Sequence, residues 1–502
     1  MPREALFSVE QIRAVESAFA EAHPVISLMQ RAGEATARFA ETLLGCDGGR
    51  VLVLAGPGNN GGDAWVAARA LQQSWHRVTV FCDAPGKVAA AAAQAARDAF
   101  IQDGGKTVTA WPGGETHDLI VDGLLGIGLE REVSGDLAAL IARANSSGLS
   151  ILAIDIPSGL GADSGAALGA TIRAQHTLTF IGAKPGLYTA DGRDHAGAVR
   201  VEALGIDAAL LASPNSLLTP EAVHTLAPRR SHNSHKGQFG SVGVVGGSQG
   251  MTGAALLAAR AALHLGAGKV LLAMLSDDAP AVDLLHPEIM MRKARDLLAK
   301  EILSALVIGP GMGVNDMAKN IVAEALKTAL PLVIDADALN LIADGRALQN
   351  QLARRTAISL LTPHPGEAAH LLQCSTHDVQ AHRVKAACAL AGRFKSLVVL
   401  KGCGSVVAFP DGAWHVNASG NPGMASGGMG DALAGMLGAL LAQGVAPPDA
   451  LMLGVCLHGA AADFAVAQHC GPAGLTASEV IFSAREVLNE WAAPAEQSHE
   501  AH

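Results

Sequence analysis

The sequence predicts an α/β protein of two successive three-layer αβα domains, and three observations support this. The chain has 502 residues, and at roughly 100–200 residues per domain that is enough for two to four domains with their own cores. Half of the residues are hydrophobic but only 3% are aromatic, so Ala, Val, Leu and Ile must form the cores. Short continuous apolar runs alternate with Ala-rich segments, which is typical of parallel strands covered by helices on both faces.

The first half begins with helices and continues with strands. Ser8 and Gln11 have the spacing of a capping box, and apolar spacing resumes after Pro24 as far as about Leu44, so both segments are predicted helices. The predicted strands of this half are 51–56, 78–83, 118–123, 151–156 and 177–182.

A proline-rich and polar segment separates the two halves. It carries three prolines and the basic pair Arg229–Arg230. A metal site at His232 and His235 is an alternative, but no further ligand stands at zinc spacing, which favours a solvated hinge. We therefore predict domains at 1–212 and 237–493, joined by a linker at 213–236 and followed by a tail. The predicted strands of the second half are 241–247, 269–275, 305–311, 332–339, 357–364, 397–402 and 405–409.

Composition disfavours several classes of partner. The net charge is −10 with no long basic block, which argues against nucleic acid and anionic membranes. The seven cysteines are scattered and form no Cys-x-x-Cys pair, so a reducing compartment is expected. No signal-peptide core or uninterrupted membrane span stands out. We expect a cytoplasmic homo-oligomer.

A glycine-rich turn follows the first predicted strand. In AGPGNNGGDAW (55–65) three glycines fit G-x-G-x-x-G, which alone suggests a dinucleotide-binding turn with Asp83 on the ribose. Asp63 counts against a pyrophosphate there, because its carboxylate would compete for the same amide hydrogens. Asn59 and Asn60 suit a polar ligand edge or a monovalent cation. A plain turn with Asp63 as the helix cap is the alternative.

Two further predicted strands end in an acid followed by glycine, VDGLLGIGLERE with Asp122 and IDIPSGL with Asp155. Ligands of parallel sheets bind outside the carboxyl ends of the strands, so these loops and the glycine turn should meet at one crevice. Oxygens from Asn60, Asp122 and Ser158 can surround a cation there, while Asp155 faces a substrate. A lone strand-end Asp is more often a turn former, but three such loops favour a site.

GNNGGDA, VDGLLGIG and DIPSGL together resemble the NAD(P)H-hydrate epimerase domain, over about residues 8 to 205. The resemblance implies that Asn60, Asp122 and Ser158 hold potassium, and the fold expected is Rossmann-like. It implies that the hydrated nucleotide is bound by Asn59, Asn60, Gly61, Gly62, Asp63, Gly126, Ile127, Gly128, Leu129, Glu130, Arg131, Glu132 and Asp155. We hypothesise that Asp155 is the acid/base group as the carbon-6 hydroxyl leaves and water re-enters.

The most informative stretch of the second half is GNPGMASGGMGDALAGMLGALLA (420–442). Its glycines free backbone N–H groups to converge at a helix N-terminus, which makes an anion hole. Asp431 stands at its edge, placed to take a proton from a hydroxyl that receives a phosphoryl group. A simple Gly-Asp helix cap is the alternative.

Two other strand ends of this half suggest binding. KGCGS, which begins at Lys401, can lay its backbone along phosphates, although a plain strand-end turn is nearly as good an explanation. TPHPGE holds His364 between two prolines, which fix the loop that presents the ring. The strand ends DADALN and GPGMG face the same crevice.

These motifs, with SQGMTGAALLAA, resemble the ADP- or ATP-dependent NAD(P)H-hydrate dehydratase family, which has a ribokinase-like fold, over about residues 219 to 490. The implied nucleotide contacts are Lys401, Gly402, Cys403, Gly404, Ser405 and Gly430. The implied hydrate contacts are Ala254, Gly311, Gly313, His364 and Asp431. Ser405 stands where threonine is expected, and it keeps the hydroxyl.

The two resemblances imply one repair function. The first domain interconverts the R and S hydrates NADHX and NADPHX, and the second dehydrates the S form with magnesium and a nucleotide, expected to be ADP. Three alternatives remain: a small-molecule kinase with a stable phosphorylated product, an NAD-dependent dehydrogenase, and a non-catalytic scaffold or RNA-binding first domain. Asp63 argues against the dehydrogenase, and the acidic balance argues against the RNA-binding module.

Overall fold

The computed structural model describes residues 4–45, 48–82, 91–112, 116–207, 209–298, 302–469 and 471–493. Asp83 and the tail after Ala493 lie outside these residues. The chain divides into two compact units, with Glu4–Asn215 in one and the residues from Ser216 onward in the other.

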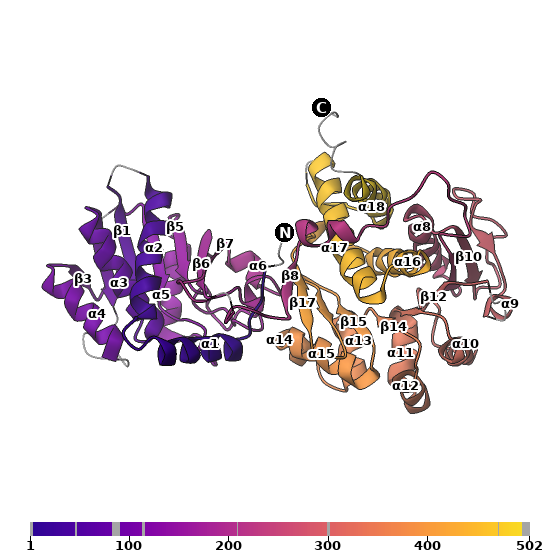
Figure 1. Ribbon diagram of the computed structural model, residues 1–502, viewed down its shortest axis with the longest axis horizontal. Helices are drawn as coiled ribbons and strands as arrows, with labels where there is room; N and C mark the ends of the chain where they lie inside the picture. Colours follow the sequence, from indigo (N-terminus) through magenta and orange to yellow (C-terminus); the bar gives the residue numbers. More distant parts are fainter. Residues whose placement is uncertain are drawn as a thin grey trace. The chain divides into compact units, whose positions relative to one another are not determined.

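The first unit is built on a seven-stranded sheet in the part of the chain that the structure describes (Figure 1). Its strands are β1 (Arg50–Ala55), β2 (Arg77–Cys82), β3 (Lys106–Val108), β4 (Leu119–Gly123), β5 (Ser150–Ile154), β6 (His176–Phe180) and β7 (Ala198–Glu202). All neighbours are parallel, in the order β3-β2-β1-β4-β5-β6-β7. The strand order reverses between β1 and β4, and such a switch point is where doubly wound sheets bind ligands.

Helices cover both faces of this sheet, as the continuous apolar runs require. They are α1 (Val9–Ala22), α2 (Leu28–Leu44), α3 (Asn59–Gln73), α4 (Ala91–Gln102), α5 (Gly135–Asn145) and α6 (Gly192–His195), with a 3-10 turn η1 (Pro185–Leu187). Val51 and Val53 of β1 pack with α1–α4, whereas Leu52 and Leu54 pack with α5. Alternate side chains of one strand therefore enter two cores, which confirms the predicted three layers.

The second unit has a ten-stranded sheet among the described residues. Its strands are β8 (Ser216–Leu218), β9 (Ser241–Gly246), β10 (Lys269–Met274), β11 (Met290–Met291), β12 (Ala305–Ile308), β13 (Leu332–Ile334), β14 (Ser359–Leu361), β15 (Leu397–Leu400), β16 (Val406–Ala408) and β17 (Trp414–Asn417). The order is β11-β10-β9-β12-β13-β14-β15-β16-β17-β8, antiparallel only on either side of β16.

The helices of the second unit again lie on two faces (Figure 1). They are α7 (Pro220–Val223), α8 (Thr252–His264), α9 (Ala294–Leu298), α10 (Asp316–Lys327), α11 (Ala336–Asp344), α12 (Arg346–Ala353), α13 (Pro365–Leu372), α14 (Thr376–Ala381), α15 (Arg383–Phe394), α16 (Met429–Ala442), α17 (Pro447–His469) and α18 (Ala477–Ala492), with 3-10 turns η2 (His224–Leu226) and η3 (Pro422–Met424). Helices α8 and α16–α18 share one core with the sheet. Within the described residues, only α17 is long and apolar enough to cross a membrane, and 72% of its most apolar window is buried, as in a core helix.

The segment predicted as a linker contributes to the second unit. Residues 216–218 form β8, which pairs with β17, and the Ser216 amide and hydroxyl lie 3.1 and 2.8 Å from His415 Nδ1. Pro220 stands at the start of α7, where its missing N–H costs no hydrogen bond. One of the three prolines that suggested a hinge therefore begins a helix, and the second unit starts at Ser216.

Candidate active sites

A cavity of about 1010 Å³ lies at the carboxyl ends of β1, β4 and β5. Of the predicted contacts, its walls include Asn59, Asn60, Asp63, Gly126, Ile127, Gly128, Leu129, Glu130, Arg131 and Asp155. Gly61, Gly62 and Glu132 are not among the wall residues. The two glycines are buried in the first turn of α3, where a Cβ on Gly61 would lie 1.9 Å from the Gly56 carbonyl oxygen.

The glycine turn ends in an open helix N-terminus. Helix α3 starts at Asn59 after Gly58, and no side chain caps it. Asp63 is inside the helix, so the alternative in which it serves as the cap is wrong. Uncapped first-turn amides at a cavity suit an anionic ligand group.

Asn60, Asp122 and Ser158 meet around the Leu125 peptide. Ser158 donates its amide (2.8 Å) and hydroxyl (2.6 Å) to Asp122, and its hydroxyl oxygen accepts from the Leu125 amide at 2.9 Å. Asn60 Nδ2 donates to the Leu125 carbonyl at 2.8 Å. Asp122 is fully buried, and burial raises its pKa to about 6 despite the bonds from Ser158. The side chains of Asn60, Asp122 and Ser158 therefore lie close together.

Asp155 is held by a lysine that the sequence reading did not find. The Asp155 backbone is left-handed (φ 64°), which aims the residue out of the strand end. Its Oδ1 accepts from Lys184 Nζ, from the Thr179 hydroxyl (3.1 Å) and from the Phe180 amide (3.2 Å). Lys184 is fully buried and also lines the cavity. These three contacts hold the Asp155 side chain in place.

Two more carboxyls share this cavity, on Asp63 and Glu16. Burial raises the pKa of Asp63 well above its usual range, and the charges of Asp155 and Glu16 add to the effect. Burial and Asp155 also raise the pKa of Glu16. The cavity thus combines Asp155, paired with Lys184, with two carboxyls whose pKa values are raised.

A second set of charges lies at the carboxyl ends of β13–β15. Lys401 Nζ lies 2.6 Å from Asp335 Oδ1, and the Thr362 hydroxyl donates to the same oxygen at 2.7 Å. Asp335 is 1% exposed. Burial lowers the pKa of Lys401, but nearby carboxylates, chiefly Asp335, outweigh it and raise that pKa.

The predicted anion hole begins α16 beside this pair. Gly428 precedes the helix with φ 91°, a conformation that favours glycine. A Cβ on Gly430 would lie 3.0 Å from Lys401 Nζ. Burial and Asp335 raise the pKa of Asp431 to about 6, while Lys401 opposes the change. Asp431 is therefore a base of moderate strength next to the ammonium.

His364 caps α13, and its ring contacts a buried acid. Its Nδ1 accepts from the Gly366 and Glu367 amides at 3.0 and 3.3 Å, and its Nε2 lies 3.3 Å from Glu367 Oε1. Burial raises the pKa of Glu367 to about 7, although Lys401 opposes the change. Burial and Lys401 lower the pKa of His364.

The loop from Lys401 to Ser405 is supported from beneath by Arg383, which is 1% exposed. Its guanidinium donates to the Leu400 and Lys401 carbonyls at 3.3 and 3.2 Å. Ser405 donates to the Gly402 carbonyl at 3.1 Å. The predicted nucleotide contacts from Lys401 to Ser405 therefore lie in one turn that these hydrogen bonds hold in place.

The remaining predicted hydrate contacts adjoin one another. A Cβ on Gly311 would lie 3.1 Å from Ala254 Cβ, so the two residues touch. The Gly313 amide donates to Asp337 Oδ2 at 2.8 Å. Asp337 in turn raises the pKa of Asp431, which links this group to the second set of charges.

The linker histidines His232 and His235 are exposed. Across the described ranges, no group of three His, Cys, Asp or Glu residues is placed to hold a metal ion.

Sequence reasoning missed Lys184, Glu16 and Glu367. Lys184 follows a buried strand, a place where a lysine is rare unless paired, so that signal was available. Glu16 lies on an amphipathic helix and Glu367 completes a capping box, and both patterns have ordinary structural explanations.

Comparison with known families agrees with this division of the chain. The family described as YjeF-related protein N-terminus matches residues 25–186, and the family described as NAD(P)H-hydrate dehydratase matches residues 242–482. A Bacillus subtilis ADP/ATP-dependent NAD(P)H-hydrate dehydratase, co-crystallised with ATP and Mg²⁺, superposes with a TM-score of 0.50 at 31% identity. The match covers 55% of this chain and 98% of that one.

Relatives of full length extend the similarity across both units. The bifunctional NAD(P)H-hydrate repair enzyme Nnr of Escherichia coli is 39% identical over 92% of this chain and 89% of its own length. The Coxiella burnetii protein of the same name is 38% identical over 96% of this chain and 99% of its own length. The chain belongs to the family of bifunctional NAD(P)H-hydrate repair enzymes.

Proposed function

We propose that the first unit interconverts the R and S hydrates of NADH and NADPH and that the second unit dehydrates the S form. One observation supports this most directly: Gly430 and Asp431 lie against the buried Lys401–Asp335 pair, so an anion hole, a cation and a base meet at one point. Such a constellation suits phosphoryl transfer to a hydroxyl.

In the first unit, the lone pair of the substrate's ring nitrogen expels the carbon-6 hydroxyl. An acid gives that hydroxyl a proton, water leaves, and a planar iminium cation remains. Water then adds to either face while a base takes its extra proton, and the electron pair of the C=N bond returns to nitrogen. Asp155, which pairs with Lys184, is the base in this scheme.

Asp63 is suited to be the acid. Its raised pKa favours the protonated form, and it enters the cavity from the β1–α3 side, whereas Asp155 follows β5. Strand β4 lies between β1 and β5, so a substrate over the end of β4 would have one carboxyl on each side. A protonated Asp63 would also remove the repulsion of a phosphate that the sequence suggested.

Potassium fits the oxygen donors around Leu125. Asp122 is fully buried, and its carboxylate accepts from the Ser158 amide and hydroxyl and from the Leu124 amide, none of which carries a charge. A buried carboxylate with uncharged oxygen neighbours suits a weakly hydrated cation. Asn60, Asp122 and Ser158 would hold the ion, which would neutralise Asp122 and stiffen the loop that carries the substrate contacts.

In the second unit, Asp431 takes the proton of the carbon-6 hydroxyl as the terminal phosphoryl group of the nucleotide passes to that oxygen. With ADP the leaving group is AMP. The C–O bond then breaks with its electron pair going to phosphate, a proton passes from carbon 5 to water, and the electron pair of that C–H bond forms the new double bond. Lys401 and the α16 amides stabilise the phosphoryl charge. Magnesium, bound mainly by phosphate oxygens, would shield that charge, with Asp335 and Glu367 as the nearby buried carboxyls.

The test is to mix purified protein with the S hydrate, magnesium and ADP and to follow the absorbance of reduced nicotinamide. Return of that absorbance with release of phosphate supports dehydration. A stable phosphorylated hydrate would support the kinase alternative instead, and hydride transfer without added nucleotide would support the dehydrogenase. Replacing ADP with ATP settles the nucleotide, and size-exclusion chromatography tests the expected homo-oligomer.

A further inference from the structure

A second cavity, of about 1160 Å³, lies at the edge of the second sheet, between β10–β11 and helices α9 and α10. Its floor is apolar and includes Leu272, Met274, Met291 and Ile321. The residues described above as hydrate or nucleotide contacts do not line it. Its size is that of a site for a nucleotide or a drug-sized molecule.

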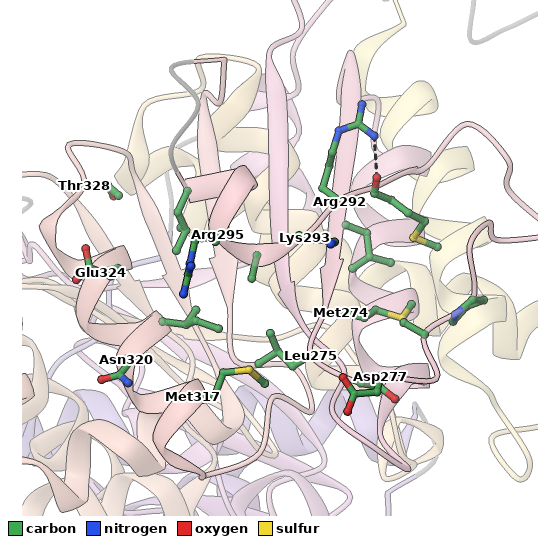
Figure 2. Close-up of a pocket in the computed structure, with 18 of the residues that line it drawn as sticks. Met274, Leu275, Asp277, Arg292, Lys293, Arg295, Met317, Asn320, Glu324 and Thr328 are labelled. Atoms are coloured by element: carbon green, nitrogen blue, oxygen red, sulfur yellow. Dashed lines mark hydrogen bonds between the residues drawn. The ribbon is translucent and has the colours of Figure 1, made fainter.

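Unpaired cations face this cavity. Lys293 and Arg295 line it, and Figure 2 labels both among the residues around the cavity. In the described part of the chain, neither forms a salt bridge or side-chain hydrogen bond. Arg292 instead donates to the Met291 carbonyl at 2.7 Å, and Lys327 pairs with Glu324 at 2.6 Å. Two free cations over an apolar floor suit an anionic ligand with a flat or apolar part.

Hydrogen bonds connect the cavity wall to the loop that leads to the predicted hydrate contact Ala254. Ser276 donates to Gln249 Oε1 at 2.7 Å, and Gln249 Nε2 donates to Asp278 at 2.9 Å. Gln249 belongs to the SQGMTGA loop, which leads to Ala254, and Ser276 lines the cavity. One wall thus continues from the predicted hydrate contacts to the cavity.

Exposed apolar side chains lie next to both the predicted hydrate contacts and the cavity. Met251, Val314 and Met317 are 53%, 62% and 50% exposed. Met251 touches Gly311, and Met317 lines the cavity. Strand β10 is two positions from β12, about 10 Å at the usual strand spacing. A dinucleotide is longer than this distance.

We propose that this cavity binds the adenosine half of the hydrated dinucleotide, with Lys293 and Arg295 contacting its phosphate groups while the hydrated ring lies at Asp431. The proposal rests on the dehydratase function of the second unit. It also gives the chain a means of distinguishing NADPHX, which has a 2′-phosphate, from NADHX, which has only the pyrophosphate.

The test compares the full-length double variant Lys293→Ala/Arg295→Ala with the unaltered protein. We expect KM for the S hydrate to rise about ten-fold or more, while kcat and the KM for ADP stay unchanged within about two-fold, because two charged contacts to the phosphate groups are lost. A rise for NADPHX alone places the 2′-phosphate there, and an equal rise for both hydrates places the pyrophosphate there. Lys319→Ala, which removes an exposed lysine of α10 that does not line the cavity, is the control and should leave KM unchanged.

Adenosine 2′,5′-bisphosphate gives a second readout. It should inhibit the unaltered protein competitively with the hydrate and not with ADP, and the double variant should lose this inhibition. An unchanged hydrate KM in the double variant, or inhibition competitive with ADP alone, would overturn the proposal. Failure of the unaltered protein to dehydrate either hydrate would instead refute the proposed function.

Discussion

Lys401 and Asp335 form a buried ion pair, 2.6 Å between Nζ and Oδ1, although they stand 66 residues apart in the chain. They follow β15 and β13, which are separated only by β14 in the sheet. Gly430 lies against both side chains. The pair therefore holds the Lys401 ammonium group beside the first turn of α16.

Lys401→Met should destabilise the second unit strongly. The substitution leaves Asp335, which is 1% exposed, without its counter-charge, a loss of about 3–5 kcal/mol in similar cases. Urea unfolding measures it. Lys327→Met, which removes the exposed pair with Glu324, is the matched control and should change the unfolding free energy by about 0–1 kcal/mol. Equal effects would show that the buried pair has no special role.

The dehydratase rate should rise with pH through about 6. Burial and Asp335 raise the pKa of Asp431 to about 6, and a base acts only when ionised, so activity is present above that value and lost below it. Asp431→Asn should lower kcat about 10²–10⁴-fold and remove this dependence. An Asp431→Asn protein that keeps the wild-type pH profile would assign the base to another group.

Asp155→Asn and Asp63→Asn should each abolish epimerisation but differ in the partial reaction that remains. Asp155→Asn retains the acid Asp63, so water can still leave and return on the Asp63 side, and this variant should exchange the carbon-6 oxygen of one epimer with ¹⁸O-labelled water while retaining its configuration. Asp63→Asn lacks the acid and should not exchange. Mass spectrometry of the separated epimers measures this exchange. An unchanged rate of interconversion in Asp155→Asn would refute its role.

The epimerase rate should also fall at high pH. Since the pKa of Asp63 is raised, the acid is present below that pKa and is lost as pH rises through it. The oxygen exchange that remains in Asp155→Asn, which retains Asp63, should show the same decline. An exchange rate in that variant that does not fall as pH rises would point to a different acid.

Potassium should raise the Tm of the first unit in a pH-dependent way. Burial raises the pKa of Asp122 to about 6, so the carboxylate that would bind the ion is present above that pH. Calorimetry should show a larger shift with potassium than with choline at pH 8, and little shift at pH 5. Asp122→Asn should remove the difference, and an equal response to both salts would argue against a specific site.

The sequence predicted the layers and glycine loops because these depend on local patterns. Val51 to Leu54 form a continuous apolar run. Such a run predicts a strand whose side chains are buried on both faces of a sheet, whichever strands are its neighbours. Strands β3 and β7 were not predicted because none of their side chains is fully buried, so they lack a continuous apolar run. Residues 216–218 were assigned to the linker because three residues beside prolines carry no periodic signal.

The lysines that pair with carboxylates of the two proposed sites were harder to predict. Asp155 and Asp431 were identifiable from glycine-rich neighbours, but Lys184 and Lys401 reach their acids through pairing between strands, which one sequence does not reveal. The raised pKa of Asp63 likewise depends on the burial of α3 in the cavity. With its pKa raised, Asp63 repels a phosphate less than a solvated carboxylate would.

The most direct test of the account uses a racemic mixture of R and S hydrates with excess ADP, magnesium and the full-length protein. Complete return of the reduced-nicotinamide absorbance is predicted, with Asp155→Asn stopping near half and Asp431→Asn giving no return. Conversion that stops near half in the unaltered protein would contradict the claim that the two units act on the same hydrate in sequence.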